Sequence, residues 1–302
     1  MKGYLFPGQG SQYVGMGQSL YHHSSRAHQM FATADRILGM DLTYMMLEGG
    51  QEALKETTVA QPAIFLHAVA TAFLSDSFDP AAVAGHSLGE ISALVASRVL
   101  SFEDGLRLVA VRSKAMQKAC QLCPGTMAAV LGLSDEVVEA ICAKITQEVV
   151  VPANYNYPGQ LVISGSQAGV ALATEALMEA GARKVIPLQV EGGFHSPLMA
   201  DAQESVAAVF ASIPFSKGIC PIYQNVTGLP VTDPETIKAN LLQQLVAPIY
   251  WTKTIHHMVE DGITACIECG PGKVLQGLVR KIAPSLSVEP LSVLGETQSS
   301  AY

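Results

Sequence analysis

The chain has 302 residues, of which 49% are hydrophobic, and it carries a formal net charge of −8 at pH 7. This length and apolar content can bury a large core in one large domain or two. The acidic balance argues against non-specific binding of nucleic acid. The N-terminal apolar run is too short for a signal peptide, and no later run approaches the length that crosses a bilayer. We therefore expect a cytoplasmic protein without membrane contact.

The first part of the chain predicts alternating strands and helices, from the spacing of apolar residues and the positions of helix breakers. In chain order the elements are a buried strand at 2–6, a glycine loop, helices at 26–38 and 61–74, a strand end at Val83-Ala84, and helices at 90–100 and 103–120. The breaker Cys123-Pro124-Gly125 follows the last helix and indicates a domain boundary.

The next segment has short strands arranged around two helices. Strands are predicted at 127–131, 149–153, 160–164 and 184–188, and helices at 135–147 and 167–181. This βαββαβ order is the ferredoxin-like pattern, a compact unit that can be inserted into a larger fold.

After Gly192-Gly193 the sequence returns to helices alternating with strands. The predicted elements are a helix at 196–212, a strand at 222–224, helices near Ile237 and Ile255, a strand at 265–268 and a helix at 273–282. We therefore predict an α/β protein with a discontinuous catalytic domain formed by residues 1–124 and 190–302. A ferredoxin-like domain, residues 125–189, is inserted over its active-site face. The polar residues 296–302 are expected to form a frayed terminus.

Six cysteines include two CxxC pairs, Cys120 with Cys123 and Cys266 with Cys269. Such spacing can hold zinc, but these pairs lie far apart in the sequence, and Cys266 falls in an apolar run typical of a strand. We therefore expect buried or incidental thiols and no metal site.

The pentapeptide Gly85-His86-Ser87-Leu88-Gly89 has the GxSxG pattern of a nucleophile elbow and lies between a strand end and a helical stretch. Its glycines permit the sharp turn that exposes the serine hydroxyl at a helix N-terminus, where developing negative charge is favoured. This context favours a nucleophile over a chance match.

A serine nucleophile needs a base to accept its proton. Of the eight histidines, six lie in helical or polar stretches where surface or core roles are expected, and His86 lies inside the pentapeptide. His195 instead lies in a loop between a predicted strand and a predicted helix, where catalytic groups are usually placed. We predict His195 as the base, the alternative being a helix-capping or structural histidine.

Several separated motifs make the chain resemble the malonyl-CoA:acyl carrier protein transacylases over nearly its whole length. They are FPGQGSQ at 6–12, GHSLGE at 85–90, Arg112, NYNYPGQ at 154–160, FHS at 194–196 and ECGPG at 268–272. The resemblance implies an α/β-hydrolase-like core with an inserted ferredoxin-like domain, in agreement with the order of elements above.

The resemblance also implies an activity. Malonyl would move from coenzyme A to Ser87 and then to the phosphopantetheine thiol of an acyl carrier protein, in a ping-pong reaction with His195 as base. Malonyl-CoA is then a substrate, no cofactor is bound, and the partners are the carrier protein and the CoA thioester. The backbone N–H groups of Gln9 and Leu88 would hold the oxyanion. We expect a monomer.

The resemblance assigns the substrate pocket as well. Arg112 would hold the free carboxylate of malonyl by paired charge-assisted hydrogen bonds, although a lone helical arginine is by itself more often at the surface. Phe194 leaves little room for an α-methyl group, which favours malonyl. Asn154 and Asn156 either shape the pocket from the inserted domain or form a plain turn.

Two positions depart from the family's pattern. The family orients its histidine with a backbone carbonyl just before a tryptophan; here that carbonyl would belong to Tyr250, and a tyrosine is unusual there. Gly193 stands where we expect alanine, which predicts a looser loop. Neither departure removes a catalytic group.

Alternatives remain open at this point. A serine acyl-hydrolase acting on carrier-protein or CoA thioesters would use the same serine and histidine, but the family's hydrolytic relatives lack the arginine, so Arg112 favours transfer. A non-catalytic module that binds carrier proteins would not need Ser87, His195 and Arg112 together. Fatty-acid and polyketide roles are not separated. Five basic residues either form a patch for an acidic partner or are solvated charges: Lys184, Lys253, Lys273, Arg280 and Lys281.

Overall fold

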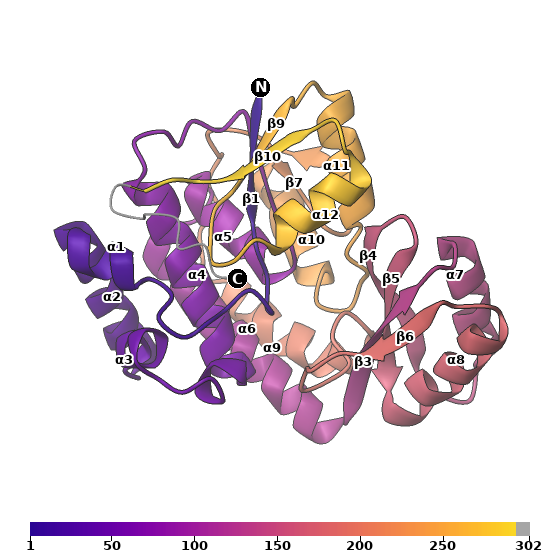
Figure 1. Cartoon of the computed structure of the whole chain (residues 1–302). Coiled ribbons are helices and arrows are strands. Elements are labelled where there is room, and N and C mark those ends of the chain that lie inside the picture. Colours follow the sequence, from indigo (N-terminus) through magenta and orange to yellow (C-terminus); the bar gives the residue numbers. More distant parts are fainter. Residues whose placement is uncertain (294–302) are drawn as a thin grey trace.

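The computed structural model describes residues 1–293, in which two β-sheets are surrounded by helices (Figure 1). The larger sheet has six strands in the order β10-β9-β1-β2-β7-β8. These strands are β1 (Lys2–Phe6), β2 (Ala82–Gly85), β7 (Ile222–Tyr223), β8 (Pro230–Val231), β9 (Ala265–Glu268) and β10 (Ser287–Pro290). Neighbouring strands are parallel except for β7 and β8. The frayed terminus expected at 296–302 lies outside the described residues.

The register of the larger sheet brings three sequence motifs to one edge. Leu5 of β1 lies opposite Ala84 of β2 and Glu268 of β9, so these strands end side by side. FPGQGSQ, GHSLGE and ECGPG, which begin at the last one or two residues of these strands, therefore leave the same edge. In open parallel sheets, ligand sites lie at this carboxyl edge.

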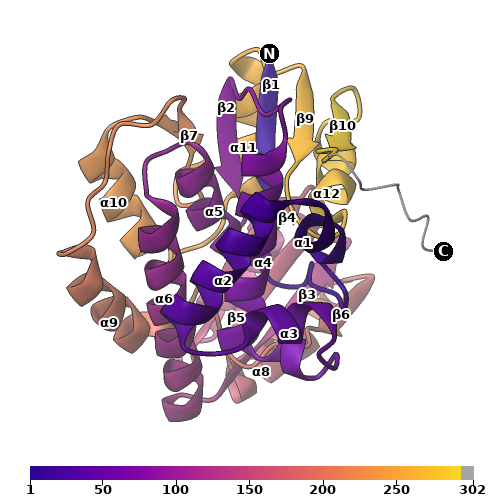
Figure 2. The ribbon, with the colours of Figure 1, turned by 90° about the vertical axis from the view of Figure 1, so that its left-hand side faces the viewer.

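Helices cover both faces of the larger sheet (Figures 1 and 2). The helices outside residues 125–187 are α1 (Gln18–His23), α2 (Ser25–Leu38), α3 (Leu42–Leu47), η1 (Ala53–Lys55), α4 (Thr57–Leu74), α5 (Leu88–Ala96), α6 (Phe102–Leu122), η2 (Pro197–Met199), α9 (Ala200–Phe210), α10 (Pro234–Gln243), α11 (Trp251–Glu260) and α12 (Val274–Ile282). Alternate residues of β1 divide between the faces: Tyr4 and Phe6 join the core with α2, α4, α5 and α6, whereas Leu5 joins the core with α11 and α12.

The smaller sheet has four strands in the order β4-β5-β3-β6, and all its neighbouring pairs are antiparallel. Its elements are β3 (Gly125–Leu131), α7 (Asp135–Lys144), β4 (Val150–Tyr157), β5 (Gln160–Ser166), α8 (Gln167–Glu179) and β6 (Lys184–Pro187). These elements form the smaller unit, and the elements around the six-stranded sheet form the larger unit. Ala128 and Val130 of β3 pack in a core with α7 and α8, whereas Met127 and Ala129 join the core of the larger unit. One face of this sheet is therefore buried against the rest of the chain.

Most predicted elements are present, with shifts at their ends. The strands at 2–6 and 265–268 and the βαββαβ order of the middle segment are confirmed. The short elements α1, α3, β8 and β10 were not predicted. The helix predicted at 196–212 is a 3₁₀ turn followed by α9.

Helix α4 differs from its prediction in two ways. It begins at Thr57 and not at residue 61, and the carboxylate of Glu191 accepts the Thr57 N–H at 3.0 Å. This tertiary contact satisfies one of the free N–H groups of the first turn. The helix is also long and apolar enough to cross a membrane by length and composition, so the expectation that no run approaches that length was wrong. However, 83% of it is buried inside the protein, as in a core helix.

Candidate active site

Ser87 lies at the turn between β2 and α5, in a backbone conformation that serine rarely adopts. Its φ is 53° and its ψ is −108°. The turn is held against β1 by a close approach: a Cβ at Gly89 would lie 1.9 Å from the carbonyl oxygen of Phe6. Only glycine fits there, so the spacing of the motif follows from the packing of the turn on the strand end.

The hydroxyl of Ser87 contacts His195. The Ser87 Oγ and His195 Nε2 atoms are 2.7 Å apart, and His195 Nδ1 lies 2.8 Å from the carbonyl oxygen of Gln244. Because a carbonyl only accepts, Nδ1 carries the proton, and the lone pair of Nε2 faces the serine. The geometry is that of a nucleophile paired with an oriented base.

The prediction that the Tyr250 carbonyl orients His195 was wrong, because Gln244 supplies that acceptor. Tyr250 is instead the residue before α11, and its carbonyl accepts from the N–H of Thr254, as in the first turn of a helix. Its ring lies against that of Tyr155, with centroids 4.9 Å apart, where it contributes to the core of the smaller sheet.

Burial and a nearby cation keep His195 neutral. Only 3% of its surface is exposed, and desolvation, followed by the positive charge of Arg112, lowers its pKa to about 3. The imidazole is therefore uncharged at neutral pH and can accept a proton.

Arg112 of α6 is a buried cation that contacts the serine. It is 3% exposed, and it donates to Gln61 Oε1 at 2.7 Å, to Ser87 Oγ at 3.1 Å and to Gln244 Oε1 at 3.2 Å. Burial lowers its pKa to about 10, so it stays charged at neutral pH. Within residues 1–293 it forms no salt bridge, and its direct partners are neutral amides and a hydroxyl. Such a group favours an anionic ligand.

Two expected oxyanion donors lie beside the elbow. Leu88 is the first residue of α5, and its N–H donates to no acceptor among the described residues. Gln9 lies in the loop after β1, where a Cβ at Gly8 would meet the carbonyl oxygen of His86 at 2.5 Å. The side chain of Gln9 donates to Thr57 Oγ1 at 3.3 Å, which ties the loop to α4.

The other expected pocket residues, Asn156, Phe194 and Asn154, differ in their contacts and burial. His86 Nε2 is 3.1 Å from Asn156 Oδ1, which joins the smaller sheet to the residue before Ser87. Phe194 is 6% exposed and precedes His195 directly. Asn154 pairs through its backbone with Ile249, and its Oδ1 is buried without a partner among the residues described.

The loop before His195 is tightly packed, contrary to the looser loop predicted from Gly193. A Cβ there would lie 2.8 Å from the carbonyl oxygen of Gly165, and the Gly193 carbonyl accepts from Ser196 Oγ at 2.6 Å. The missing side chain allows this close approach.

Four buried polar residues of the site were not predicted as site residues. Gln61, Asn225 and Gln244 lie in no recognisable motif, and Glu90 stands out in the sequence only as the last residue of GHSLGE. Asn225 Oδ1 accepts the Ser87 N–H at 2.7 Å, and its Nδ2 donates to Gly85 at 2.7 Å. A buried amide leaves no signal in one sequence, since its role depends on distant partners.

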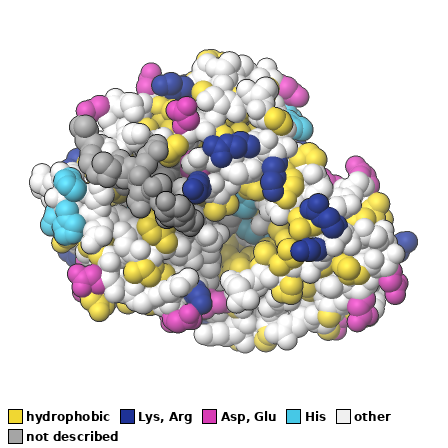
Figure 3. Space-filling model, viewed as in Figure 1, with side chains coloured by type: hydrophobic (Ala, Val, Ile, Leu, Met, Phe, Trp, Pro, Cys, Tyr) yellow, Lys and Arg dark blue, Asp and Glu magenta, His cyan; other side chains and the backbone are white. Residues whose placement is uncertain are grey.

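Figure 3 shows the molecule hollowed between the larger and the smaller unit, with Lys and Arg side chains around the hollow. Two of the five basic residues singled out above contact aromatic rings near β4. Lys281 donates to the Tyr157 hydroxyl at 3.0 Å, and Lys253 lies 4.2 Å from the centroid of the Tyr250 ring.

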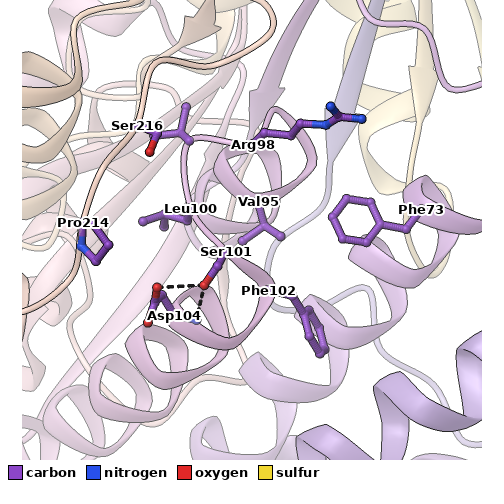
Figure 4. Close-up of a pocket in the computed structure, with 10 residues that line it drawn as sticks. Phe73, Val95, Arg98, Leu100, Ser101, Phe102, Asp104, Pro214 and Ser216 are labelled. Carbon is purple, nitrogen blue, oxygen red and sulfur yellow. Dashed lines mark hydrogen bonds between the residues drawn. The ribbon is translucent and has the colours of Figure 1, made fainter.

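A surface pocket elsewhere does not belong to this site. Figure 4 shows it between the end of α4, the end of α5, the start of α6 and residues 214–216, and neither Ser87 nor His195 lines it. Its lining includes Phe73, Arg98, Phe102, Asp104 and Pro214.

The cysteines show no sign of a metal centre. All six are unpaired, and the part of the chain that the structure describes contains no cluster of three or more His, Cys, Asp or Glu residues that could hold a metal. Burial raises the pKa of Cys120, Cys142 and Cys266, so these thiols are inert at neutral pH.

Comparison with known proteins gives the family. Residues 3–300 match the family described as acyl transferase domain. The malonyl CoA-acyl carrier protein transacylase of Bacillus subtilis (strain 168) is 42% identical over 283 residues, which are 92% of this chain and 89% of that protein.

Solved structures agree over the same length. An acyl carrier protein S-malonyltransferase from Vibrio cholerae matches with a TM-score of 0.92 at 38% identity, covering 97% of both chains. A malonyl-transacylase in complex with its type II polyketide synthase acyl carrier protein matches with a TM-score of 0.91 at 36% identity, covering 98% of this chain and 96% of that one. The chain belongs to the acyl transferase domain family, among the malonyl CoA-acyl carrier protein transacylases.

Proposed function

We propose that this chain transfers malonyl from coenzyme A to the phosphopantetheine thiol of an acyl carrier protein, through a malonyl ester on Ser87. The observation that carries the proposal is the position of Arg112, a buried cation that donates to Ser87 Oγ at 3.1 Å and contacts no carboxylate within residues 1–293. Malonyl has a free carboxylate two bonds from its thioester carbon, so one ligand can meet both the guanidinium and the serine.

In the first half-reaction, the Ser87 hydroxyl attacks the thioester carbon while His195 Nε2 takes its proton. The tetrahedral oxyanion is stabilised by the N–H groups of Leu88 and Gln9 and by the N-terminus of α5. The C–S bond then breaks, and the imidazolium returns its proton to the coenzyme A thiolate. The products are free coenzyme A and the malonyl ester of Ser87.

In the second half-reaction, the acceptor of the malonyl group is the thiol of the carrier protein. His195 takes the thiol proton, the thiolate attacks the ester carbon, and the proton passes to Ser87 Oγ as the ester breaks. No cofactor takes part in these steps, and malonyl-CoA and the carrier protein are the substrates.

Substrate binding also makes His195 a better base. The charge of Arg112 is the second largest cause of its lowered pKa, after burial. A malonyl carboxylate bound to Arg112 offsets that charge, so the pKa of His195 rises when the correct acyl group is present. Acetyl has no carboxylate to offset the charge of Arg112. The enzyme therefore distinguishes malonyl from acetyl in the proton transfer as well as in binding.

The remaining pocket roles are part of the same proposal. Phe194 limits the space beside the α-carbon of the acyl group, and Asn156 holds His86 next to the nucleophile. Asn154 brings its buried Oδ1 to the boundary between the two units.

We describe the fold as an α/β-hydrolase-like core, residues 1–124 and 190–302, with a ferredoxin-like domain inserted at 125–189. The strand order β4-β5-β3-β6 with all pairs antiparallel supports the second name. The six unpaired cysteines support a cytoplasmic location, and we propose that the chain works as a monomer.

The test is the intact mass of the protein after brief mixing with malonyl-CoA, with and without a phosphopantetheinylated acyl carrier protein. We expect one malonyl adduct that survives in water and moves to the carrier when it is added. Ser87→Ala should form no adduct. An adduct that disappears without a carrier indicates a hydrolase instead. An adduct that forms equally from acetyl-CoA contradicts the proposal that Arg112 binds the malonyl carboxylate.

A further inference from the structure

A buried carboxylate lies behind the elbow and does not take part in the reaction above. Glu90 of α5 is 1% exposed. Its Oε1 accepts from Gln224 Nε2 at 3.1 Å, and its Oε2 accepts from the Asn225 N–H at 2.9 Å and from Gln244 Nε2 at 3.1 Å. All three partners are donors, so their geometry fits the ionised carboxylate, which accepts at both oxygens. Burial raises the pKa of Glu90 to about 7, and these three hydrogen bonds oppose that rise.

Two of these partners hold the nucleophile. Asn225 accepts from the Ser87 N–H and donates to the Gly85 carbonyl, so it spans the strained turn on both sides. Gln244 Nε2 donates to the Ser87 carbonyl oxygen at 3.0 Å. Glu90 therefore hydrogen-bonds directly to both of these residues, Asn225 and Gln244.

Gln244 also reaches the base and the cation. Its carbonyl accepts from His195, and its Oε1 accepts from Arg112 at 3.2 Å. A glutamine amide has a donor end and an acceptor end. Because Glu90 only accepts, it turns the NH₂ of Gln244 toward itself and Ser87, which leaves Oε1 for Arg112. With the amide reversed, two donors would face each other at the guanidinium.

We propose that Glu90 is a positioning residue for malonyl transfer: its carboxylate sets the orientation of the Gln244 amide and of Asn225, and through them the relative positions of Ser87 and Arg112. This inference rests on the proposed function. A carboxylate suits the position better than an amide, because three donors converge on it from two segments of the chain, residues 224–225 and residue 244.

The test is Glu90→Gln, which keeps the shape but introduces a donor among donors. Single-turnover acylation by malonyl-CoA and by acetyl-CoA is followed by intact mass, and each rate is divided by the fraction of protein that can be acylated. We expect the malonyl rate to fall by about tenfold or more, and the preference for malonyl over acetyl to fall with it.

Gln224→Met is the matched control. Gln224 is equally buried and donates to the same carboxylate, but its other side-chain bonds go to Ile237 and Asn240 and not to the elbow. We expect this variant to unfold at a lower temperature and to lose much less of its malonyl rate per acylatable site than Glu90→Gln, because Glu90 keeps its bonds to Asn225 and Gln244. Equal losses of rate in both variants, or an unchanged rate and preference in Glu90→Gln, overturn the proposal.

If Glu90→Gln does not fold, Gln244→Leu tests the same link, since it keeps the backbone carbonyl that contacts His195. A normal preference for malonyl in this variant overturns the proposal. The proposed function fails separately, if the unchanged protein forms no malonyl adduct that a carrier protein accepts.

Discussion

One serine oxygen is shared by a neutral base and a buried cation. Ser87 Oγ lies 2.7 Å from His195 Nε2 and 3.1 Å from an Arg112 nitrogen. Burial keeps the imidazole uncharged, whereas the guanidinium remains charged because its pKa falls only to about 10. The same low-dielectric environment thus leaves a neutral imidazole and a charged guanidinium next to each other.

Arg112→Ala tests the role of the cation. Loss of a buried ionic partner costs about 2–5 kcal/mol, so kcat/KM for malonyl-CoA should fall by roughly 30-fold to several thousand-fold, with a much smaller loss for acetyl-CoA. The measurement is acylation kinetics with both thioesters. Arg107→Ala is the control on the same helix, because Arg107 is exposed and paired with Asp104. An unchanged ratio between the two thioesters contradicts the assignment.

A site residue could be predicted from the sequence when its side chain lies in a recognisable local motif, and not when its backbone carbonyl makes the contact. Ser87 and His195 were predictable from local context, a GxSxG turn and a loop before a helix. The function of Arg112 came from resemblance, since a helical arginine has no signature of its own. Gln244 was missed and Tyr250 was wrong because the acceptor is a backbone carbonyl, which every residue has, and only the fold shows which one faces His195.

The turn at Ser87 keeps its conformation because neighbouring segments pack against it. The turn between β2 and α5 lies against the end of β1, and Asn225 bridges it from the segment after β7. The unusual backbone of Ser87 is stabilised by these contacts, which over-determine its conformation.

Gly89→Ala and Gly277→Ala compare two helical glycines with opposite surroundings. The added methyl at Gly89 would lie 1.9 Å from a backbone oxygen, so we expect a loss of about 3 kcal/mol or more in the free energy of unfolding. At Gly277 no atom of residues 1–293 apart from the adjoining chain lies within 4 Å of the added methyl, and alanine should stabilise α12 by about 0.5–1 kcal/mol. Urea denaturation measures both. Similar effects of the two substitutions would show that the close approach at Gly89 is absent.

Across the whole molecule, buried histidines link stability to pH. Burial lowers the pKa of His67, on α4, to about 4, and it lowers those of His195 and His86 as well. The unfolded chain takes up protons on these groups below about pH 6.5, whereas the folded protein does not. Their contribution to stability is therefore complete above pH 6.5 and is lost as the pH falls. Glu90 has the opposite effect on stability, because burial raises its pKa from 4.5 to about 7. Its contribution to stability is complete below pH 4.5 and is lost as the pH rises.

His67→Gln isolates one of these groups. The difference in unfolding free energy between the unchanged protein and the variant should shrink by up to about 3 kcal/mol between pH 7 and pH 4, because only the unchanged protein has this buried neutral imidazole. Urea denaturation at several pH values measures the difference, from which groups common to both proteins cancel. A difference that does not vary with pH shows that His67 titrates alike in the folded and unfolded chain.

The sequence by itself determined most of the order of elements, predicted a nucleophile and its base, and, through resemblance, gave the family. These features are local, since periodicity, glycine spacing and a strand-turn-helix context lie within short windows. The tertiary structure decided what surrounds them. It assigned the acceptor for His195 to Gln244, placed Glu90 and Asn225 behind the elbow, gave α4 its cap at Glu191, and moved Tyr250 into the core beside Tyr155. The physical reason is that these contacts join residues far apart in the sequence, and a buried hydrogen bond depends on which groups the fold brings within about 3 Å.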